Sequence, residues 1–328
     1  MSAPLLKATY LLPLKTADGA DVAELAAYLR EVAGVVDEVI VVDGSSPAEV
    51  GAHRAAFGPL VRVAEPEERT LMGKVGNVVT GLRLAAHDRV VIADDDVRYT
   101  PEQLARAVAL LDEAEVVRPQ NWFDPLPWHA RLDTARTLLA RTTGGDWPGT
   151  LAVRRSLVLE AGGYSGDVLF ENLELVRTVK AAGGREVVPL DLLVRRVPCS
   201  TPHFRGQQIR QAYDEWARPV RLVASLAVLP ALAAGVAGRR WKAVAGGVAA
   251  VSGLAEAGRR RAGGAAVFPA SSSLLAAPWL VWRSACSWGA VGARLRGGAR
   301  YRDTRIRRAA TPMRELRHRV AAARTSPR

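Results

Sequence analysis

Three consecutive carboxylates follow an apolar run in the stretch RVVIADDDVRYTPEQL, which covers residues 89–104. Like charges this close repel one another, and each raises the pKa of its neighbours unless water or a cation relieves the repulsion. We therefore expect a positive partner near Asp94, Asp95 and Asp96. A solvated acidic loop is the alternative interpretation, and other stretches of the chain must decide between the two.

The flanks of the triplet predict where it lies in the fold. Residues 89–93 are short, β-branched and apolar, which is typical of a strand buried on both faces. Thr100, Pro101 and Gln103 fit a helix start, with Thr as the N-cap, Pro in the first position and Gln three residues after the cap. The triplet is thus predicted at the carboxyl end of a strand, where open α/β sheets bind ligands.

Two further polar side chains have types that suit a nucleotide site. Asp43 ends a predicted strand, and a strand-end carboxylate can accept hydrogen bonds from a nucleobase or ribose. It could instead cap the following helix, but Ser46 already occupies that position. Arg210 could clamp a diphosphate by paired hydrogen bonds. Lys74, in a Gly-rich turn, would by itself be an ordinary solvated residue.

Five stretches carry a family resemblance by their order along the chain. They are VVDGSS (41–46), GKVGNVVTGL (73–82), IADDDV (92–97), the segment 149–184, and RGQQIRQAYDEW (205–216). The series resembles the family 2 glycosyltransferases, which are inverting enzymes with a GT-A fold, and within them the membrane-attached, ceramide-glucosyltransferase-like kind. The resemblance covers about residues 5–216. It implies an α/β fold with a mainly parallel sheet flanked by helices, followed by a helical membrane-associated region.

The resemblance implies a donor site for a nucleoside diphosphate sugar, with a UDP-sugar as the expected donor. Asp94 and Asp96 match the family's Asp-x-Asp (DxD) motif, which binds Mg²⁺ or Mn²⁺ together with the donor diphosphate. We expect Asp96 as the direct ligand and Asp94 on the ribose or on a metal-bound water. Asp95 is expected to point the other way. The nucleotide-sugar residues implied are Pro13, Asp43, Lys74, Asp94, Asp95 and Gln207.

The segment 170–174 stands where the family carries Glu-Asp, whose Asp deprotonates the acceptor hydroxyl. Here that position is Asn172, and an amide cannot take a proton at neutral pH. Glu171 is therefore the predicted base, with Asp167 as a weaker candidate. As alternatives, Glu171 serves only as a helix first-turn charge, or the site is degenerate and inactive.

The stretch 207–211 resembles the family's Gln-x-x-Arg-Trp, with Gln207 and Arg210 retained and Gln211 in the Trp place. In the family this Trp flanks the acceptor. The predicted catalytic residues are Glu171, Asn172 and Arg210. Residues predicted on the acceptor side are Trp147, Gly149 and Thr150.

The first 200 residues alternate strand-like and helix-like pieces, which implies a mainly parallel sheet with helices on both faces. The Gly-rich motifs of dinucleotide-binding folds and of P-loops are missing from the sequence. The expected strands are 8–14, 38–42 and 89–93, and the expected helices start at a capping box formed by Asp21 and Glu24, at Ser46-Pro47 with Glu49, and at Pro101, the last running to about 113.

Charge divides the chain of 328 residues into two unlike parts. Residues 1–200 carry 22 Lys and Arg against 28 Asp and Glu, a net of −6, whereas residues 201–328 carry 23 against 5, a net of +18. Apolar stretches flanked by Arg suggest an anionic membrane surface. No nucleic-acid motif accompanies the charge, so no nucleic-acid partner is expected. The two cysteines, Cys199 and Cys286, favour a reducing compartment.

Three apolar runs follow residue 205, at 222–238, 243–257 and 265–281. The first approaches the roughly 20 residues that span a bilayer. Two spans with an interfacial helix, a monotopic attachment and a buried soluble hairpin are all compatible with the sequence. The predicted domains are a GT-A catalytic domain (1–205) and a membrane-associated helical region (206–328) that ends in the basic tail RGGARYRDTRIRRAA.

The sequence thus predicts a cell-membrane glycosyltransferase whose catalytic domain faces the cytoplasm, since the N-terminus shows no signal peptide. The expected reaction is metal-dependent, inverting hexosyl transfer to a hydroxyl of a lipid or lipid-linked acceptor. Two alternatives remain. One is a nucleotide-sugar-binding membrane scaffold without catalysis. The other is a GT-A-type nucleotidyltransferase, which needs a Gly-rich, Arg-bearing loop that KTADGAD (15–21) represents poorly.

Overall fold

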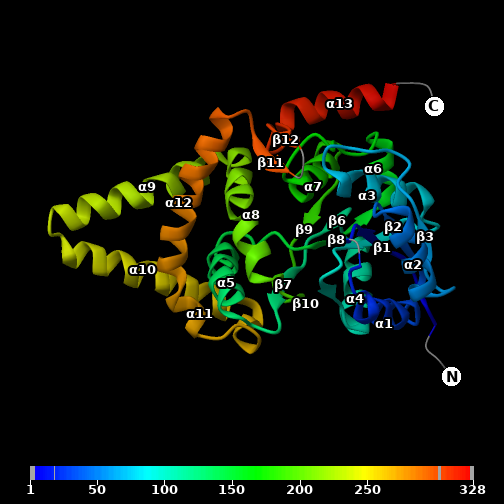
Figure 1. Ribbon diagram of the computed structural model, residues 1–328, viewed down its shortest axis with the longest axis horizontal. Helices are drawn as coiled ribbons and strands as arrows, with labels where there is room; N and C mark the ends of the chain where they lie inside the picture. The colour runs from blue at the N-terminus through cyan, green and yellow to red at the C-terminus, as the bar shows by residue number, and fades with distance from the viewer. Residues whose placement is uncertain (1–3, 18, 302–303, 326–328) are drawn as a thin grey trace.

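The fold is built on a mixed seven-stranded sheet in the order β3-β2-β1-β4-β8-β6-β9. The computed structural model describes residues 4–17, 19–301 and 304–325 (Figure 1). β1 pairs in parallel with β2 and β4, whereas β8 runs antiparallel to β4 and β6. The strands are β1 (Leu6–Leu14), β2 (Val36–Asp43), β3 (Arg62–Ala64), β4 (Arg89–Ala93), β6 (Val116–Val117), β8 (Thr150–Arg154) and β9 (Glu186–Val187). The predicted α/β architecture is confirmed.

Helices cover both faces of this sheet because its strands are apolar on both faces. In β1, Tyr10 and Leu12 face one hydrophobic cluster and Leu11 faces the other, as the two-residue period of a strand requires. Side chains of α1, α2 and α4 build the first cluster, and those of α3, α6 and α7 build the second. These helices are α1 (Ala23–Ala33), α2 (Pro47–Phe57), α3 (Gly73–Leu84), α4 (Pro101–Ala109), α6 (Arg155–Glu160) and α7 (Glu171–Ala181).

A second, three-stranded sheet lies beside the first and fixes the loop that carries the acidic triplet. It consists of β5 (Val97–Arg98), β10 (Leu193–Arg196) and β7 (Gln120–Phe123), with α5 (Trp128–Arg141) following β7. The triplet fills the gap between the end of β4 and the start of β5. Both ends of this short loop are therefore anchored in different sheets.

The predicted helix caps can be compared directly with the helix starts in the structure. The capping box at Thr100 and Gln103 is present, and a short 3-10 turn (Leu110–Asp112) continues α4. The capping box predicted at Asp21 is absent. Its side chain accepts a hydrogen bond from the backbone N–H of Ala23, so α1 begins two residues later, and Glu24 pairs with Arg98 instead.

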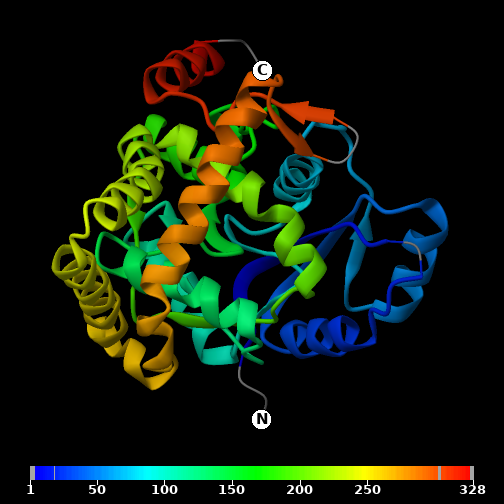
Figure 2. The same cartoon turned by 60° about the vertical axis from the view of Figure 1, so that its left-hand side comes forward.

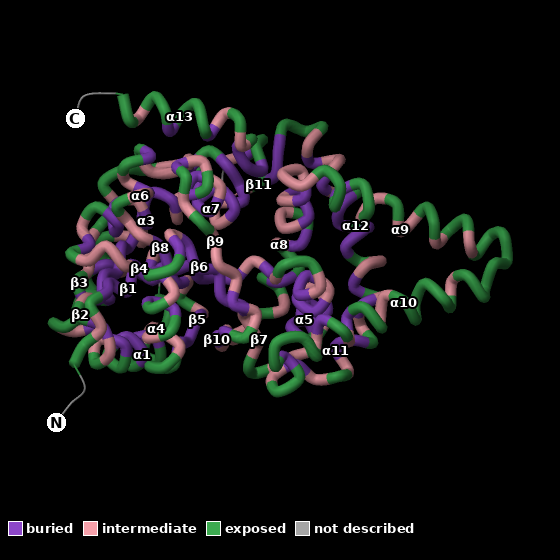
Figure 3. Tube along the Cα trace, turned by 180° about the vertical axis from the view of Figure 1, so that it is seen from behind, coloured by how far each residue is buried: buried purple, intermediate pink, exposed green. Residues whose placement is uncertain are grey.

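The C-terminal helices form two parts, a projecting arm and the long helix α12. The arm is a hairpin of α9 and α10 that projects from the body, and α12 runs between the arm and the rest of the molecule (Figures 1 and 2). Most of the arm is exposed (Figure 3). The elements after β10 are α8 (Thr201–Tyr213), a 3-10 turn (Asp214–Ala217), α9 (Pro219–Ala237), α10 (Trp241–Arg260), a 3-10 turn (Arg261–Ala266), α11 (Ser271–Leu274), α12 (Ala276–Leu295), β11 (Ala299–Tyr301), β12 (Thr304–Ile306) and α13 (Met313–Thr325).

Among the described residues, α9 is the one helix that is long and apolar enough to cross a membrane. The other two apolar runs have different surroundings. The second forms α10, which is largely exposed, and the third is divided among a 3-10 turn, α11 and the start of α12. The first eight residues of α12 include buried Trp279 and Arg283, so this part of the third run faces protein rather than solvent.

The domain boundary predicted at residue 205 falls within a helix. α8 runs through that position and packs on α12. The basic tail also returns to the catalytic part, where Leu169 and Phe170 donate backbone hydrogen bonds to the carbonyls of Arg308 and Ala309, at 3.0 and 2.8 Å. α13 then packs along α7. Two residues of the predicted tail, Arg302 and Asp303, lie outside the described residues.

Candidate active site

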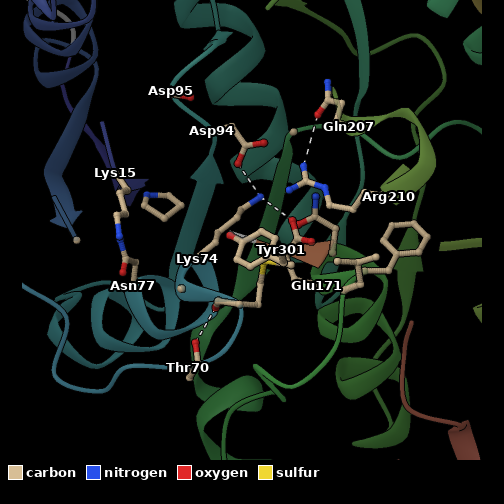
Figure 4. A pocket seen from close by; sticks show the side chains of 18 of the residues that line it. Lys15, Thr70, Lys74, Asn77, Asp94, Asp95, Glu171, Gln207, Arg210 and Tyr301 are labelled. Carbon is tan, nitrogen blue, oxygen red and sulfur yellow. Dashed lines mark hydrogen bonds and ion pairs between the residues drawn. The ribbon is translucent and has the colours of Figure 1, made fainter. Parts of the chain in front are cut away.

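A cavity of about 1070 Å³ opens at the carboxyl ends of β1, β2 and β4 and is closed on the other side by α7, α8 and α12. It brings together residues that are separated by more than 200 positions in the sequence (Figure 4). Two predicted site residues, Asp96 and Thr150, are not among its lining. Those that line it are Pro13, Asp43, Lys74, Asp94, Asp95, Trp147, Gly149, Glu171, Asn172, Gln207 and Arg210.

Asp43 lies at the nucleotide end, but its carboxylate is already engaged. One oxygen accepts the backbone N–H of Ser45 at 2.9 Å, and the other lies 2.6 Å from Nδ1 of His53, with both side chains fully buried. This differs from the expectation of a free acceptor for ribose or base. Sequence analysis missed His53, because no local pattern relates a histidine inside α2 to the strand end ten residues earlier.

Lys74 and Asn77 lie in the first turn of α3, where the sequence predicted a Gly-rich turn. Nδ2 of Asn77 donates to the carbonyls of Leu14 and Val42, at 2.9 and 2.8 Å, and so joins the ends of β1 and β2. Gly81 allows α3 to approach the sheet, because a Cβ there would stand 2.2 Å from a methyl carbon of Leu11. The motif thus builds a helix pressed onto β1 that holds Lys74 over the cavity.

Lys74 joins the acidic triplet to the predicted base. Its Nζ lies 2.6 Å from Oδ1 of Asp94 and 3.0 Å from Oε1 of Glu171, and Figure 4 shows it between the two carboxylates. Burial alone would lower the pKa of Lys74, but the charges of Asp94 and Glu171 raise it well above its usual value. A charged ammonium therefore separates two carboxylates that would otherwise repel each other.

The acidic triplet is arranged differently from the prediction. Asp94 and Asp95 line the cavity, whereas the Asp96 carboxylate turns to Arg196, whose Nε donates to it at 2.9 Å. The other Asp96 oxygen is buried and finds no hydrogen-bond partner among the described residues. Burial, followed by the charges of Asp96 and Asp94, raises the pKa of Asp95 to about 6. Arg196, at the end of β10, was not singled out from the sequence.

The triplet has a donor set that suits a hard divalent cation. No group of three or more His, Cys, Asp and Glu side chains forms a complete metal site in the part of the chain that the structure describes. Mg²⁺ and chemically similar ions need only one or two protein carboxylates when phosphate oxygens and water supply the remaining ligands. The carboxylates of Asp94 and Asp95, which line the cavity, therefore suit Mg²⁺ or Mn²⁺ bound jointly with a diphosphate.

Glu171 and Asn172 open α7 and have separate tasks. Glu171 faces Lys74, at a helix N-terminus that favours its negative charge. Nδ2 of Asn172 donates to the carbonyl of Pro148 at 2.9 Å and fixes the loop before β8. A carboxylate could not donate that bond. This contact gives a structural reason for Asn at a position where a base was expected.

The loop before β8 lies close to the triplet. The carbonyl of Gly149 accepts the backbone N–H of Asp94 at 2.8 Å, and a Cβ on Gly149 would stand 2.8 Å from Oδ2 of Asp94. Trp147 lines the cavity edge-on to Phe170, with ring centroids 5.0 Å apart. Thr150, predicted on the acceptor side, is buried, and its hydroxyl donates to the carbonyl of Ile92.

Gln207 and Arg210 reach the cavity from one face of α8, three residues apart. Nη2 of Arg210 lies 3.4 Å from Oε1 of Gln207, and the guanidinium stands 5.5 Å from the ring centre of Tyr301 (Figure 4). Among the described residues no carboxylate forms an ion pair with Arg210. The guanidinium is thus available to an anionic ligand. Tyr301 comes from β11, which sequence analysis had assigned to the tail.

A second group of charged side chains lies at the α12 end of the cavity. Arg136 is paired with Asp133 and Asp146, and Nη2 of Arg218 lies 3.1 Å from Oε1 of Glu215. None of these residues was identified from the sequence. Asp214 lies among them, and burial, followed by the charge of Glu171, raises its pKa to about 8. Asp214 is therefore protonated at neutral pH.

This pKa makes the stability of the protein depend on pH. Between pH 4 and 8 the folded state holds a proton on Asp214 that the unfolded state has lost, so stability falls as pH rises through this window. Asp214→Asn removes the effect. We expect the difference in melting temperature, variant minus wild type, to be larger at pH 8 than at pH 5 by roughly a few degrees.

Melting curves at both pH values would check this expectation. Asp167→Asn, at an exposed carboxylate, serves as the matched control and should show the same difference from wild type at each pH. A constant difference for Asp214→Asn as well would mean that Asp214 titrates normally in the folded protein.

One protein family matches part of the chain, and several solved structures are similar to it in fold. The family described as Glycosyl transferase family 2 matches residues 21–131, about a third of the chain. No protein of curated function matches the sequence. Among solved structures, the mannosyltransferase PcManGT from Pyrobaculum calidifontis, in complex with GDP-Man and Mn²⁺, is similar with a TM-score of 0.50 and 18% identity, covering 98% of this chain and 87% of that chain.

Two weaker likenesses cover less of the molecule. Glucosyl-3-phosphoglycerate synthase from Mycobacterium tuberculosis has a TM-score of 0.41 at 21% identity and covers 62% of this chain and 76% of that one. Mannosyl-3-phosphoglycerate synthase from Rubrobacter xylanophilus has a TM-score of 0.42 at 18% identity, with 62% and 70% covered. At these identities the solved structures bear on the fold alone. Residues 21–131 therefore match the Glycosyl transferase family 2 model, and the chain has a GT-A-like α/β fold similar to that of PcManGT.

Proposed function

We propose that the protein transfers a hexose from a nucleoside diphosphate donor to an acceptor hydroxyl at a membrane surface, with inversion at the anomeric carbon. The observation that carries this proposal is the bridge from Asp94 through Lys74 to Glu171. It puts the carboxylates suited to a metal-bound diphosphate and the candidate base at one place in the cavity. A single displacement needs both, one on each side of the anomeric carbon.

The donor end is proposed to hold Mg²⁺ or Mn²⁺ through the acidic triplet together with the donor diphosphate. Such a cation neutralises the charge that develops on the departing nucleoside diphosphate. Arg210 supports the same charge by paired hydrogen bonds. The structurally similar PcManGT was solved with GDP-Man and Mn²⁺, whereas the family resemblance favours a UDP-sugar, so both nucleotides belong in any test.

The acceptor step uses Glu171. The acceptor oxygen forms a bond to the anomeric carbon while the bond from that carbon to the diphosphate breaks, and Glu171 takes the hydroxyl proton. Lys74 holds the Glu171 carboxylate at the cavity through their hydrogen bond. Asn172 fixes the loop at Pro148 and has no part in the proton transfer.

The exposed arm supports a membrane-bound acceptor. Val220, Val223 and Trp241 are 82, 66 and 58% exposed, an unusual exposure for apolar side chains of this size. Arg239, Arg240 and Lys242 lie at the turn between α9 and α10. Apolar side chains within the interface and cations among anionic headgroups are the features of a monotopic attachment. A lipid or lipid-linked acceptor follows from this placement.

The test is turnover of UDP- and GDP-sugars by the detergent-purified protein, with Mn²⁺ and liposomes made from a natural lipid extract. We expect one donor to be consumed, with sugar recovered in the lipid fraction and consumption abolished by EDTA. Sugar recovered only in the aqueous phase would reject the lipid acceptor. Metal-dependent binding without any turnover would instead support a nucleotide-binding scaffold, for which Asn172 at the base position is the motivating observation.

A further inference from the structure

Arg283 is a buried cation without a protein partner. It lies on α12, is 3% exposed and lines the cavity. No hydrogen bond or ion pair joins its guanidinium to any residue that the structure describes, and its Nη1 is buried without a partner. Its one ring contact is with Trp279, 5.2 Å away, whose own indole N–H is also unpartnered. Burying a charge without a partner is strongly destabilising, so this arrangement requires a reason.

A buried arginine with a structural role looks different in this same protein. Arg141 is fully buried, and its guanidinium donates to the carbonyls of Gly258, Leu190 and Arg261. The fold thus satisfies a guanidinium completely where it serves packing. Arg283 has no such set of carbonyls among the described residues, although it lines the cavity.

The carboxylates near Arg283 are already taken by other guanidiniums. Asp133 is paired with Arg136, and Glu215 is paired with Arg218. Asp214 is held neutral by its raised pKa. Burial is the main cause that lowers the pKa of Arg283, and the charge of Arg136 adds to it. Arg283 is therefore a guanidinium at this end of the cavity with which no carboxylate among the described residues forms an ion pair.

Arg218 completes the cationic end of the cavity. Its Nε is buried without a partner, and burial lowers its pKa to about 10. The guanidinium stands 5.2 Å from the ring centre of Phe170, the residue before the candidate base Glu171. Arg218 therefore lies beside the proposed acceptor step rather than beside Asp43 at the proposed nucleotide end.

We propose that Arg283 and Arg218 bind an anionic group, a phosphate or a group of similar charge, that the acceptor itself carries beside its reactive hydroxyl. This inference rests on the proposed glycosyl transfer and narrows its acceptor class. The helix that carries Arg283 also contacts the arm, where the indole N–H of Trp288 donates to the carbonyl of Leu226 at 3.2 Å. An acceptor with an anionic head and an apolar tail fits this continuity between cavity and arm.

The test measures binding of phosphate probes to the full chain by calorimetry, with UDP and Mn²⁺ present to fill the donor end. The probes are octyl phosphate, glycerol 3-phosphate and octanol. We expect octyl phosphate to bind wild type and Arg283→Met to bind it at least tenfold more weakly, while UDP affinity stays unchanged. Arg296→Met, which removes an exposed charge from the end of the same helix, is the control and should bind like wild type.

The probes separate the source of the anion. Binding of octyl phosphate but not of glycerol 3-phosphate would indicate that the anion belongs to a lipid headgroup. Equal binding of both probes would indicate a soluble phosphate compound. Either result supports the anion-binding subsite. Arg283→Met should melt at the same temperature as wild type or higher, because it removes an unpaired buried charge. Equal probe affinity in wild type and variant, or no phosphate binding to wild type, would overturn the proposal.

Failure of this subsite and failure of the proposed function give different results. If donor turnover persists while no phosphate probe binds, the acceptor is neutral and the transfer mechanism stands. If phosphate probes bind through Arg283 while no sugar nucleotide binds or turns over, the anion site stands and the proposed function falls.

Discussion

Glu171→Gln is expected to reduce sugar transfer by about 10² to 10⁴-fold, the usual contribution of a general base. Gln keeps the size of the side chain and its contact with Lys74 but cannot accept the acceptor proton. Nucleotide binding should be retained, because Glu171 does not contribute to the nucleotide end of the cavity around Asp43. Single-turnover rates together with the dissociation constant of UDP would separate the two effects.

Two further variants sharpen this assignment. Asp167→Asn removes the other candidate base, which is exposed, and should leave the rate unchanged. Asn172→Asp restores the carboxylate of the family pattern but removes the hydrogen bond to Pro148, so we expect a slower enzyme. If Asp167→Asn is slower while Glu171→Gln keeps full activity, Asp167 rather than Glu171 is the base. If Asn172→Asp is faster than wild type, the native Asn172 limits the rate of transfer.

Asp94→Asn is expected to lower turnover by about 10²-fold or more, because a cation that is poorly held cannot stabilise the leaving diphosphate. The Mn²⁺ concentration needed for half-maximal rate should rise in parallel. Asp95→Asn and Asp96→Asn test the rest of the triplet. If Asp96 is the direct ligand, Asp96→Asn should need the highest Mn²⁺ concentration for half-maximal rate. If instead Asp94 and Asp95, which line the cavity, bind the ion, their variants should need more Mn²⁺ than Asp96→Asn.

Metal titrations of the three variants would decide among these assignments. Arg196→Met is a useful companion, because it frees Asp96 from its hydrogen bond without touching the carboxylates. An unchanged Mn²⁺ requirement in all three carboxylate variants would reject the triplet as the metal site.

The sequence predicted those features that depend on neighbours in the chain. The strand 89–93 and the capping box at Thr100 agree with the structure, since burial on both faces and an N-cap leave local patterns. Asp21 shows the limit of such patterns. Its capping box is lost because Glu24 instead pairs with Arg98, which lies 74 residues away.

The cationic part of the cavity could not be predicted from the sequence in the same way. Arg196, Arg218 and Arg283 come from a strand, a turn and a helix that converge only after folding. Arg283 lies two residues after the third apolar run (265–281), for which the sequence left both a membrane and a soluble setting open. The one sequence signal for this site was a single arginine among Trp and Val side chains. Whether it indicates a ligand site depends on whether its helix faces lipid or a cavity, which the sequence does not give.

The return of the C-terminal segment to α7 has a consequence for the order in which the protein matures. Residues 308 and 309 fix the backbone of Leu169 and Phe170, immediately before Glu171, and the ribosome adds them after the entire α9–α10 arm. Domains generally begin to fold during synthesis from the N-terminal side. The arm is therefore made, and able to reach a lipid surface, while the start of α7 still lacks its support. If the arm binds a membrane as proposed, it does so before the backbone ahead of Glu171 is fixed.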